Sequence, residues 1–317
     1  MPEHYLLPKR LAAALPRMTA VMARVDAAFL SSGFRLLRFL SPANAQRLAA
    51  GLFGLLGPLG MNSAKVRNNL RIAFPDSSDA ELEQLIRATY RHAGTAAAEL
   101  AHGGTLHNEL STRLEVVTAD PDIELPSPGK PAIMVTAHVG AWQYAAMLGP
   151  ALGIPFTILY APEFNPHVRK TFFDLRQAFG CQWISRDNSM RPLMKELAAG
   201  HSIGLANDTR FDHGRLLPFF GRDAATNTVP ARLALRFNCP LIALRCDRLP
   251  NQRYRLVLSR QIMADRRCED QDQQVLRMTA ELNNEFETWI RNTPGEWLCM
   301  KRRWPREPEA SEQHTDN

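Results

Sequence analysis

The sequence predicts an α/β fold: a mixed, largely parallel sheet flanked by helices, preceded by an N-terminal helical region. Two patterns lead to this prediction. From residue 131 onward, short apolar strand-like runs alternate with helical segments, which is typical of sheets whose strands are joined through helices. Up to residue 94 the pattern is helical instead. The chain has 317 residues, of which 45% are hydrophobic and 22% charged, as expected for a packed globular protein.

Residues 1–60 are basic and apolar together. Up to residue 50 there are seven Lys or Arg but only two acids. Phe29–Leu40 mixes Phe and Leu with Arg at helical spacing, which suits either a helix lying in a membrane interface or an amphipathic helix packed on the protein. A helix over 48–57 would be only about 15 Å long, against about 30 Å of hydrocarbon in a bilayer. We therefore predict a membrane-associating region that binds peripherally or monotopically.

The next segment contains signals for helix ends. Pro75 ends one predicted helix, and Ser78 followed by Glu81 predicts a capping box that opens another. That second helix has one apolar face at helical spacing. Its predicted buried residues are Leu82, Leu85, Ile86, Thr89 and Tyr90.

We expect residues 61–304 to form the main domain and the polar residues 305–317 to form a disordered tail. The predicted strands of the main domain are 131–137, 154–160, 182–185, 202–207, 240–246 and 253–258. The predicted helices lie near 141–152, 165–179, 189–199, 227–238 and 271–292.

The stretch TAHVGAWQYA, Thr136–Ala145, places a histidine directly after the first of these strands. In α/β folds, active sites lie at the carboxyl ends of strands. Because the turn at Val139–Gly140 is short, a residue five positions after His138 falls in the first turn of the next helix and can reach the imidazole. A carboxylate there would fix the tautomer and stabilise the imidazolium, but the residue is Gln143. Taken alone, His138 is either a catalytic base or a hydrogen-bonded core residue.

Three more polar residues stand at positions suited to a site. Asp208 follows another predicted strand, Arg176 lies on a predicted helix, and Arg186 lies in the loop after the short strand 182–185. Each has a structural alternative: Asp208 as a turn former, and the two arginines as solvated surface.

Several motifs between about Lys65 and Trp304 are similar to those of a known protein family. They are VRNNLRIAFP, AHVGAW, LRQAFG followed by ISR, ND, PFFGRDAATNT and PGEWLCMKRRW. Together they make the chain similar to the lipid A biosynthesis acyltransferases, the lauroyl and myristoyl transferases of Gram-negative bacteria, within the wider lysophospholipid acyltransferase class. The set is specific, although no single motif would be.

The resemblance implies a histidine and an acid five residues later as the catalytic pair. His138 matches the histidine, and Gln143 stands where the family has Glu or Asp. Arg176 and Asp208 match an arginine and an aspartate of the family's active site. The catalytic set implied is therefore His138, Gln143, Arg176 and Asp208.

Three further residues in the shared motifs are expected to contact substrate: Trp142, Arg186 and Thr226. A Tyr-Arg-Pro that many members have is YAP here, so Ala161 replaces an arginine.

The implied reaction moves a fatty acyl chain from an acyl carrier protein to a hydroxyl of a lipid A precursor or related glycolipid, at the cytoplasmic face of the cell inner membrane. His138 would take the hydroxyl proton. Arg176 would hold an acceptor phosphate or stabilise the oxyanion, and Asp208 would fix Arg176 or the acceptor. The expected partners are the acyl carrier protein, an anionic lipid or glycolipid acceptor and the membrane surface. No metal and no bound cofactor are expected.

Gln143 leaves three alternatives: a slow enzyme, an enzyme compensated by a nearby acid such as Glu163 or Asp208, or a lapsed enzyme. On the first, Gln143→Glu raises turnover at least tenfold, about 1.4 kcal/mol of barrier, and this is the outcome the sequence alone favours. On the second, a new glutamate beside another negative charge leaves turnover unchanged or lower. If the protein is a lapsed enzyme, neither wild type nor Gln143→Glu turns over an acyl-carrier substrate.

A second class of function is a non-catalytic lipid-binding homologue that lost the catalytic carboxylate, which Gln143 and Ala161 favour and the retained His138, Arg176 and Asp208 oppose. The formal net charge of +6 favours anionic partners. No nucleic-acid-binding motif accompanies it, and we expect no nucleic acid partner. The five cysteines lack CxxC spacing, so neither a disulfide framework nor a zinc site is predicted.

Overall fold

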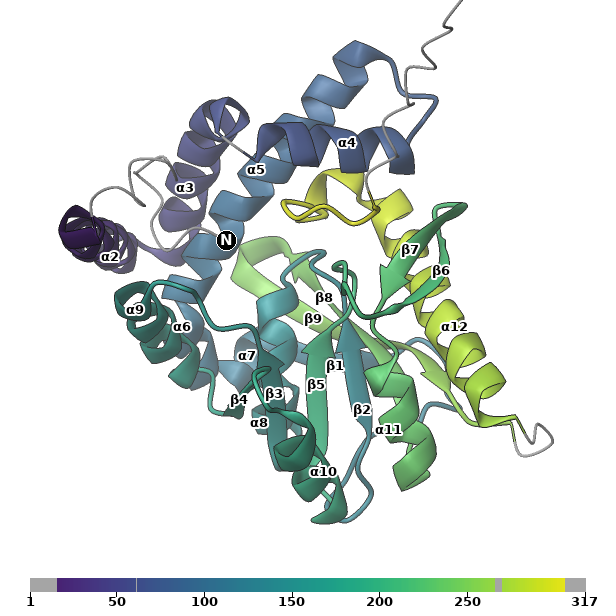
Figure 1. Ribbon diagram of the computed structural model, residues 1–317. Coiled ribbons are helices and arrows are strands. Elements are labelled where there is room, and N and C mark those ends of the chain that lie inside the picture. Colours follow the sequence, from purple (N-terminus) through teal and green to yellow (C-terminus); the bar gives the residue numbers. More distant parts are fainter. Residues whose placement is uncertain (1–15, 61, 266–269, 306–317) are drawn as a thin grey trace, which may run out of the picture.

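A seven-stranded sheet organises the structure (Figure 1). The computed structural model describes residues 16–60, 62–265 and 270–305. The predicted tail, 305–317, lies outside these residues except for its first position.

The strand order in this sheet is β1-β9-β8-β2-β5-β3-β4. Five neighbours, β8, β2, β5, β3 and β4, run parallel, whereas β9 is antiparallel to β8 and pairs parallel with β1. The mixed, largely parallel sheet is thus confirmed. The strands are β1 (Leu114–Thr118), β2 (Ile133–Thr136), β3 (Phe156–Tyr160), β4 (Gln182–Ser185), β5 (Ser202–Ala206), β8 (Leu241–Leu249) and β9 (Arg253–Ile262).

Each of the six predicted strands exists, within a few residues at either end. The edge strand β1 and a separate hairpin of β6 (Arg215–Phe219) and β7 (Arg222–Thr226) were not predicted. β1 is only half-buried throughout, and the hairpin has several exposed positions, so neither has the continuous burial of an inner strand.

Helices cover both faces of the sheet and form the N-terminal layer. The longer ones are α2 (Pro16–Phe39), α3 (Pro42–Leu56), α4 (Ser63–Ala73), α5 (Asp79–Ala101), α9 (Pro166–Gln177), α10 (Met190–Ala198), α11 (Val229–Phe237) and α12 (Gln271–Asn292). The short ones are α6 (Gly103–Asn108), α7 (Leu110–Arg113), α8 (Leu148–Leu152), and the 3-10 turns η1 (Gly57–Leu59), η2 (Trp142–Met147), η3 (Pro250–Gln252) and η4 (Pro294–Glu296).

Two apolar cores lie on opposite faces of the sheet. Met134 of β2 packs with residues of α8 and α9 on one face, while Ile133 and Val135 pack with α10, α11 and α12 on the other. The alternation follows from the strand period of two, because neighbouring side chains point to opposite faces. Buried on both faces, the central strands read as continuous apolar runs.

The predicted capping box opens α5. The Ser78 hydroxyl accepts from the backbone N–H of Glu81, and the Glu81 carboxylate accepts from the backbone N–H of Ser78. α3 packs closely along α5, since a Cβ on Gly94 would lie 2.2 Å from the Ala49 carbonyl oxygen. The N-terminal helices are thus joined to the main domain.

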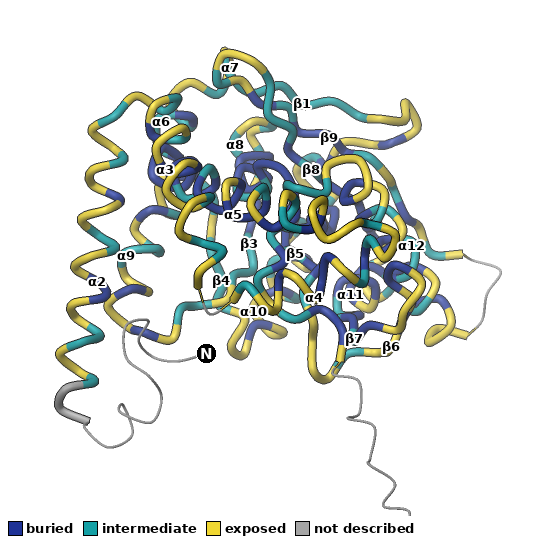
Figure 2. The backbone as a smooth tube through the Cα atoms, turned by 90° about the horizontal axis from the view of Figure 1, so that it is seen from above, coloured by how far each residue is buried: buried dark blue, intermediate teal, exposed yellow. Residues whose placement is uncertain are grey.

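α2 runs along one edge of the molecule with most of its residues exposed or partly exposed (Figure 2). Its buried face packs against α9 and α5. Within residues 16–60, 62–265 and 270–305, no helix combines the length and the apolar character needed to cross a bilayer.

Candidate active site

The centre of the site is a hydrogen bond between His138 and Asp208, whose Nδ1 and Oδ1 atoms are 2.6 Å apart. Each residue stands two positions beyond the end of its strand, β2 and β5, which are neighbours. Thr136 pairs with Ala206 in that ladder, and the N–H of Asn207 donates to the Thr136 carbonyl one step further on. Continuing this register places His138 opposite Asp208.

The two members of this pair differ in exposure. The His138 side chain is 28% exposed and that of Asp208 only 1%. Burial opposes the charge of Asp208, but the His138 imidazole and hydrogen bonds from His138 and Trp297 outweigh it, so the pKa of Asp208 lies below its usual value. Asp208 is therefore ionised at neutral pH. It holds Nδ1–H of His138 and leaves Nε2 as the basic nitrogen.

Gln143, the sequence candidate for orienting the imidazole, is used elsewhere. It lies on η2, and its Nε2 donates to the Ala96 carbonyl of α5 at 2.8 Å. Among the described residues no hydrogen bond joins Gln143 to His138, whose carboxylate partner is Asp208. The expected contact of Asp208 with Arg176 is likewise not formed.

Arg176 has its own carboxylate partner. Its Nη2 and Nη1 lie 2.8 Å and 3.4 Å from the two carboxylate oxygens of Glu163. The guanidinium also lies 5.1 Å from the Tyr160 ring centroid and 5.5 Å from that of Phe172. A guanidinium bound in this way is oriented and partly neutralised.

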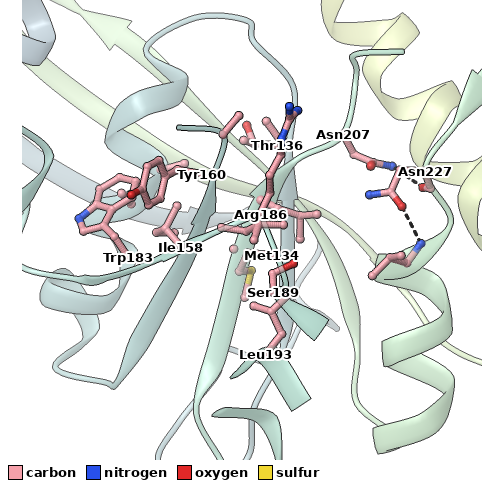
Figure 3. A pocket seen from close by; sticks show the side chains of 18 of the residues that line it. Met134, Thr136, Ile158, Tyr160, Trp183, Arg186, Ser189, Leu193, Asn207 and Asn227 are labelled. Carbon is pink, nitrogen blue, oxygen red and sulfur yellow. Dashed lines mark hydrogen bonds between the residues drawn. The ribbon is translucent and has the colours of Figure 1, made fainter. Parts of the chain in front are cut away.

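His138 lines a cavity of about 1180 Å³. Figure 3 shows this cavity from close by. Its apolar lining comes mainly from the core on the α8–α9 face and includes Met134, Ala145, Ala146, Phe156, Ile158, Phe179, Trp183 and Leu244. Its polar lining includes Arg176, Arg186, Arg191, Asn207, Arg210, Asn227 and Lys301. In Figure 3, Ile158, Tyr160 and Trp183 lie on one side and Asn207 and Asn227 on the other.

The three predicted substrate contacts are placed differently. Trp142 lines the cavity with its ring centroid 5.5 Å from that of His138. Arg186 also lines it, held by a hydrogen bond from its backbone N–H to the Tyr160 carbonyl. Thr226 is fully buried in β7, where its hydroxyl accepts from Arg303, and it is not among the residues that line the cavity.

Lys301 also lines the cavity, a position that was not predicted although it lies within the PGEWLCMKRRW motif. Burial and the nearby Arg186 guanidinium lower the pKa of its ammonium group. Glu163 was weighed only as a substitute acid, but in the structure it is the partner of Arg176.

Comparison with known proteins places the chain in a family. A model of the family described as "Bacterial lipid A biosynthesis acyltransferase" matches residues 21–306. The chain belongs to this family of acyltransferases. It is also similar to a protein named "Lipid A biosynthesis acyltransferase" from Haemophilus influenzae (strain ATCC 51907 / DSM 11121 / KW20 / Rd), at 27% identity over 190 residues. That match covers 57% of this chain and 59% of the relative.

Residues from several of the motifs quoted above contact the His138–Asp208 pair or the segment that holds it. Trp297 donates its indole N–H to the second carboxylate oxygen of Asp208 at 3.0 Å, and the N–H of Leu298 donates to the His138 carbonyl at 2.8 Å. Phe220 of the PFFG segment stacks on Trp297, with centroids 6.2 Å apart. Asn69 of VRNNLRIAFP donates to the carbonyls of Cys299 and Lys301. Motifs from the amino- and carboxyl-terminal parts of the chain therefore position the same pair.

A buried ion pair holds the turn after His138. Arg248 pairs with both carboxylate oxygens of Glu99, at 2.7 Å and 2.9 Å, and also donates to the Gly140 carbonyl at 3.1 Å. Gly140 has φ of 62°, and a Cβ there would lie 2.5 Å from the Cys246 carbonyl oxygen. A glycine is required at this position because the turn is left-handed and approaches β8 closely.

These contacts change the expectation for Gln143→Glu. A carboxylate cannot donate to the Ala96 carbonyl, and Asp208 already provides the charge beside the imidazole. We expect no gain in the rate of acyl transfer, and a loss of roughly 1 kcal/mol in folding stability for one lost hydrogen bond. Steady-state rates of wild type, Gln143→Glu and Gln143→Met test this, since the methionine variant removes the donor without adding charge. A tenfold rise in the glutamate variant would show that Asp208 does not serve as the orienting acid.

Proposed function

We propose that this protein transfers a fatty acyl chain from an acyl-carrier thioester to a hydroxyl of a lipid A precursor or related glycolipid, at the cytoplasmic face of the inner membrane. The observation that carries the proposal is the His138–Asp208 pair beside a cavity with an apolar lobe and basic residues in its lining, Arg186, Arg210 and Lys301, here called the basic mouth. A base, an apolar space and cations are what acyl transfer to an anionic lipid requires.

In the proposed reaction, Nε2 of His138 takes the proton from the acceptor hydroxyl as its oxygen attacks the thioester carbonyl. A carbon–oxygen bond forms, and the carbonyl becomes a tetrahedral oxyanion. Collapse of this intermediate breaks the carbon–sulfur bond, and the imidazolium returns the proton to the leaving thiolate. Asp208 stabilises the imidazolium throughout because it is ionised and buried.

The apolar lobe is suited to the acyl chain. It extends from Tyr160, at the end of β3 near His138, to Phe156 at the start of the same strand. That distance is about 13 Å at roughly 3.3 Å per residue. Ala145 and Ala146 line it with small side chains, which leaves room for a chain between η2 and the sheet.

The basic mouth is suited to the phosphate of the acceptor and to an acidic carrier protein. Arg186, Arg210 and Lys301 all line it. Arg176 is held by the largely buried Glu163, whereas Arg186 and Arg210 pair only with the exposed acids Asp187 and Asp212. We therefore assign acceptor phosphate binding to Arg186, Arg210 and Lys301, and to Arg176 a role in shaping the cavity wall through Tyr160.

The exposed face of α2 supports membrane association. Val21, Val25, Phe29, Leu36 and Phe39 recur at helical spacing on one side of the helix and are exposed, Phe29 by 75% and Phe39 by 88%. Exposed large apolar residues continue along α3 and η1 as Leu48, Leu52, Phe53, Leu55, Leu56 and Leu59. An apolar surface of this kind beside arginines is typical of helices that lie in a membrane interface.

We expect Phe29→Ser with Phe39→Ser to weaken vesicle binding at least tenfold, since each buried Phe contributes about 1.5–3 kcal/mol. Flotation of the full chain with vesicles measures this. The control is Leu216→Ser with Leu125→Ser, which removes two exposed leucines of the main domain. Equal loss in both pairs would place the membrane contact elsewhere than on α2.

Purified protein incubated with acyl-carrier thioester and a lipid A precursor tests the proposed reaction directly. Mass spectrometry should detect an acceptor heavier by one acyl chain, and lipids of a deletion strain should lack the corresponding species. If neither lipid changes, the alternative of a non-catalytic lipid-binding homologue is preferred. That alternative drew on Gln143 and Ala161, and the hydrogen bond between Asp208 and His138 supports the enzyme over it.

A further inference from the structure

A second groove, of about 880 Å³, lies between α2, α6 and α9, outside the catalytic cavity. Phe34 and Leu175 contribute apolar surface to it, and Arg35, Arg38 and Lys170 contribute cations. α9 is the wall between the two spaces, since Leu175 lines the groove while the next residue, Arg176, lines the cavity.

The charges in this groove do not cancel. Its two acids already have basic partners, as Glu109 pairs with Arg113 at 2.8 Å and Asp174 with Lys170 at 2.7 Å. Within the described part of the chain, neither Arg35 nor Arg38 has a carboxylate within ion-pair distance. Two guanidinium groups therefore remain available at the groove.

The surroundings of these arginines indicate the kind of anion. Leu36 and Phe39 are their neighbours in sequence. Both belong to the row of exposed apolar residues on α2 described above, here called the apolar stripe. If the stripe enters the bilayer, the arginines lie at the level of the lipid phosphates. An acidic protein bound at the same place would leave this stripe in water. Basic pockets between helices at a membrane surface are suited to anionic headgroups.

We propose that the groove between α2, α6 and α9 binds the phosphate headgroup of an anionic membrane phospholipid through Arg35 and Arg38. This inference rests on the proposed membrane association and adds a defined lipid site to it. A headgroup held there contacts α9, which also carries Arg176. Binding would thus orient the mouth of the cavity relative to the membrane surface from which the acceptor comes.

The test compares three forms of the full chain: wild type, Arg35→Gln with Arg38→Gln, and the charge-matched control Arg24→Gln with Arg47→Gln. Arg24 and Arg47 are exposed on α2 and α3 but do not line the groove. Each form is floated with vesicles of phosphatidylglycerol and phosphatidylcholine, and with phosphatidylcholine alone. We expect the groove pair to lose at least tenfold more affinity than the control pair for the anionic vesicles, with binding to phosphatidylcholine unchanged.

Three outcomes would overturn the proposal. Equal losses in the two pairs would mean diffuse charge attraction. Release of wild type from anionic vesicles by millimolar inorganic phosphate, but not by chloride at equal ionic strength, would mean a free-phosphate site. A groove pair that binds vesicles normally but loses affinity for acyl carrier protein would assign the groove to the carrier.

Acyl transfer to acceptor in detergent micelles is measured in parallel. We expect the groove pair to retain wild-type turnover there, because neither arginine lines the catalytic cavity. A groove pair that binds anionic vesicles as well as the control pair does, in a protein that transfers acyl chains, refutes only the groove, whereas absence of transfer by wild type refutes the proposed function. The exposed positions of Arg35 and Arg38 make misfolding of the variants unexpected, and circular dichroism checks this.

Discussion

His138→Ala is expected to lower the rate of acyl transfer about 10⁴-fold, the upper end of what a general base contributes. No other described residue presents a basic nitrogen that is hydrogen-bonded to a buried carboxylate beside the cavity. With the imidazole removed, the acceptor hydroxyl has no group to take its proton, and the leaving thiolate has none to return it. Single-turnover transfer from acyl carrier protein measures the effect, and thermal unfolding shows whether the fold is intact.

His201→Ala is the matched control for this variant. His201 is also paired through Nδ1 with an acid, Glu196, at 2.9 Å, and is partly exposed, but it does not line the cavity. We expect wild-type turnover from it. A His138→Ala protein with wild-type turnover would show that the base has been misidentified and would refute the mechanism.

Asp208→Asn is expected to lower kcat about 10²–10³-fold. In serine proteases the corresponding substitution costs about 10⁴, and a thioester is easier to cleave than a peptide. An asparagine still orients the ring, but it offers no charge to the imidazolium and its NH2 group favours the wrong tautomer. The matched control is Asp187→Asn, an exposed acid that lines the same cavity. Equal rates in wild type and Asp208→Asn would assign orientation of His138 to another group.

Asp208→Asn should also change how folding stability depends on pH. The pKa of Asp208 is lower in the folded protein than in the unfolded chain, where it is about 3.9. Its ionised form therefore contributes stability at neutral pH, and this contribution is lost as the pH falls through the folded pKa. We expect wild type to lose stability below about pH 4 more steeply than Asp208→Asn, as measured by unfolding at a series of pH values.

Local patterns were sufficient for much of this structure. Apolar runs predicted six of the seven strands of the sheet, the edge strand β4 among them, and the Ser78 and Glu81 spacing predicted a helix start. Both depend on interactions within a few residues. The half-buried strand β1 and the hairpin of β6 and β7 were missed.

The sequence by itself determined that His138, Arg176, Arg186 and Asp208 stand at strand ends or on the helices between strands, and that the N-terminal helices combine apolar and basic residues. Only the tertiary structure decided which of these residues meet. The position of Gln143 indicated a pairing over five residues, whereas the carboxylate that binds His138 is 70 residues away. The reason is the strand order: β5 enters the sheet between β2 and β3, and its register with β2 sets Asp208 beside His138. Strand order depends on how helices pack on both faces of the sheet, and no local spacing encodes it.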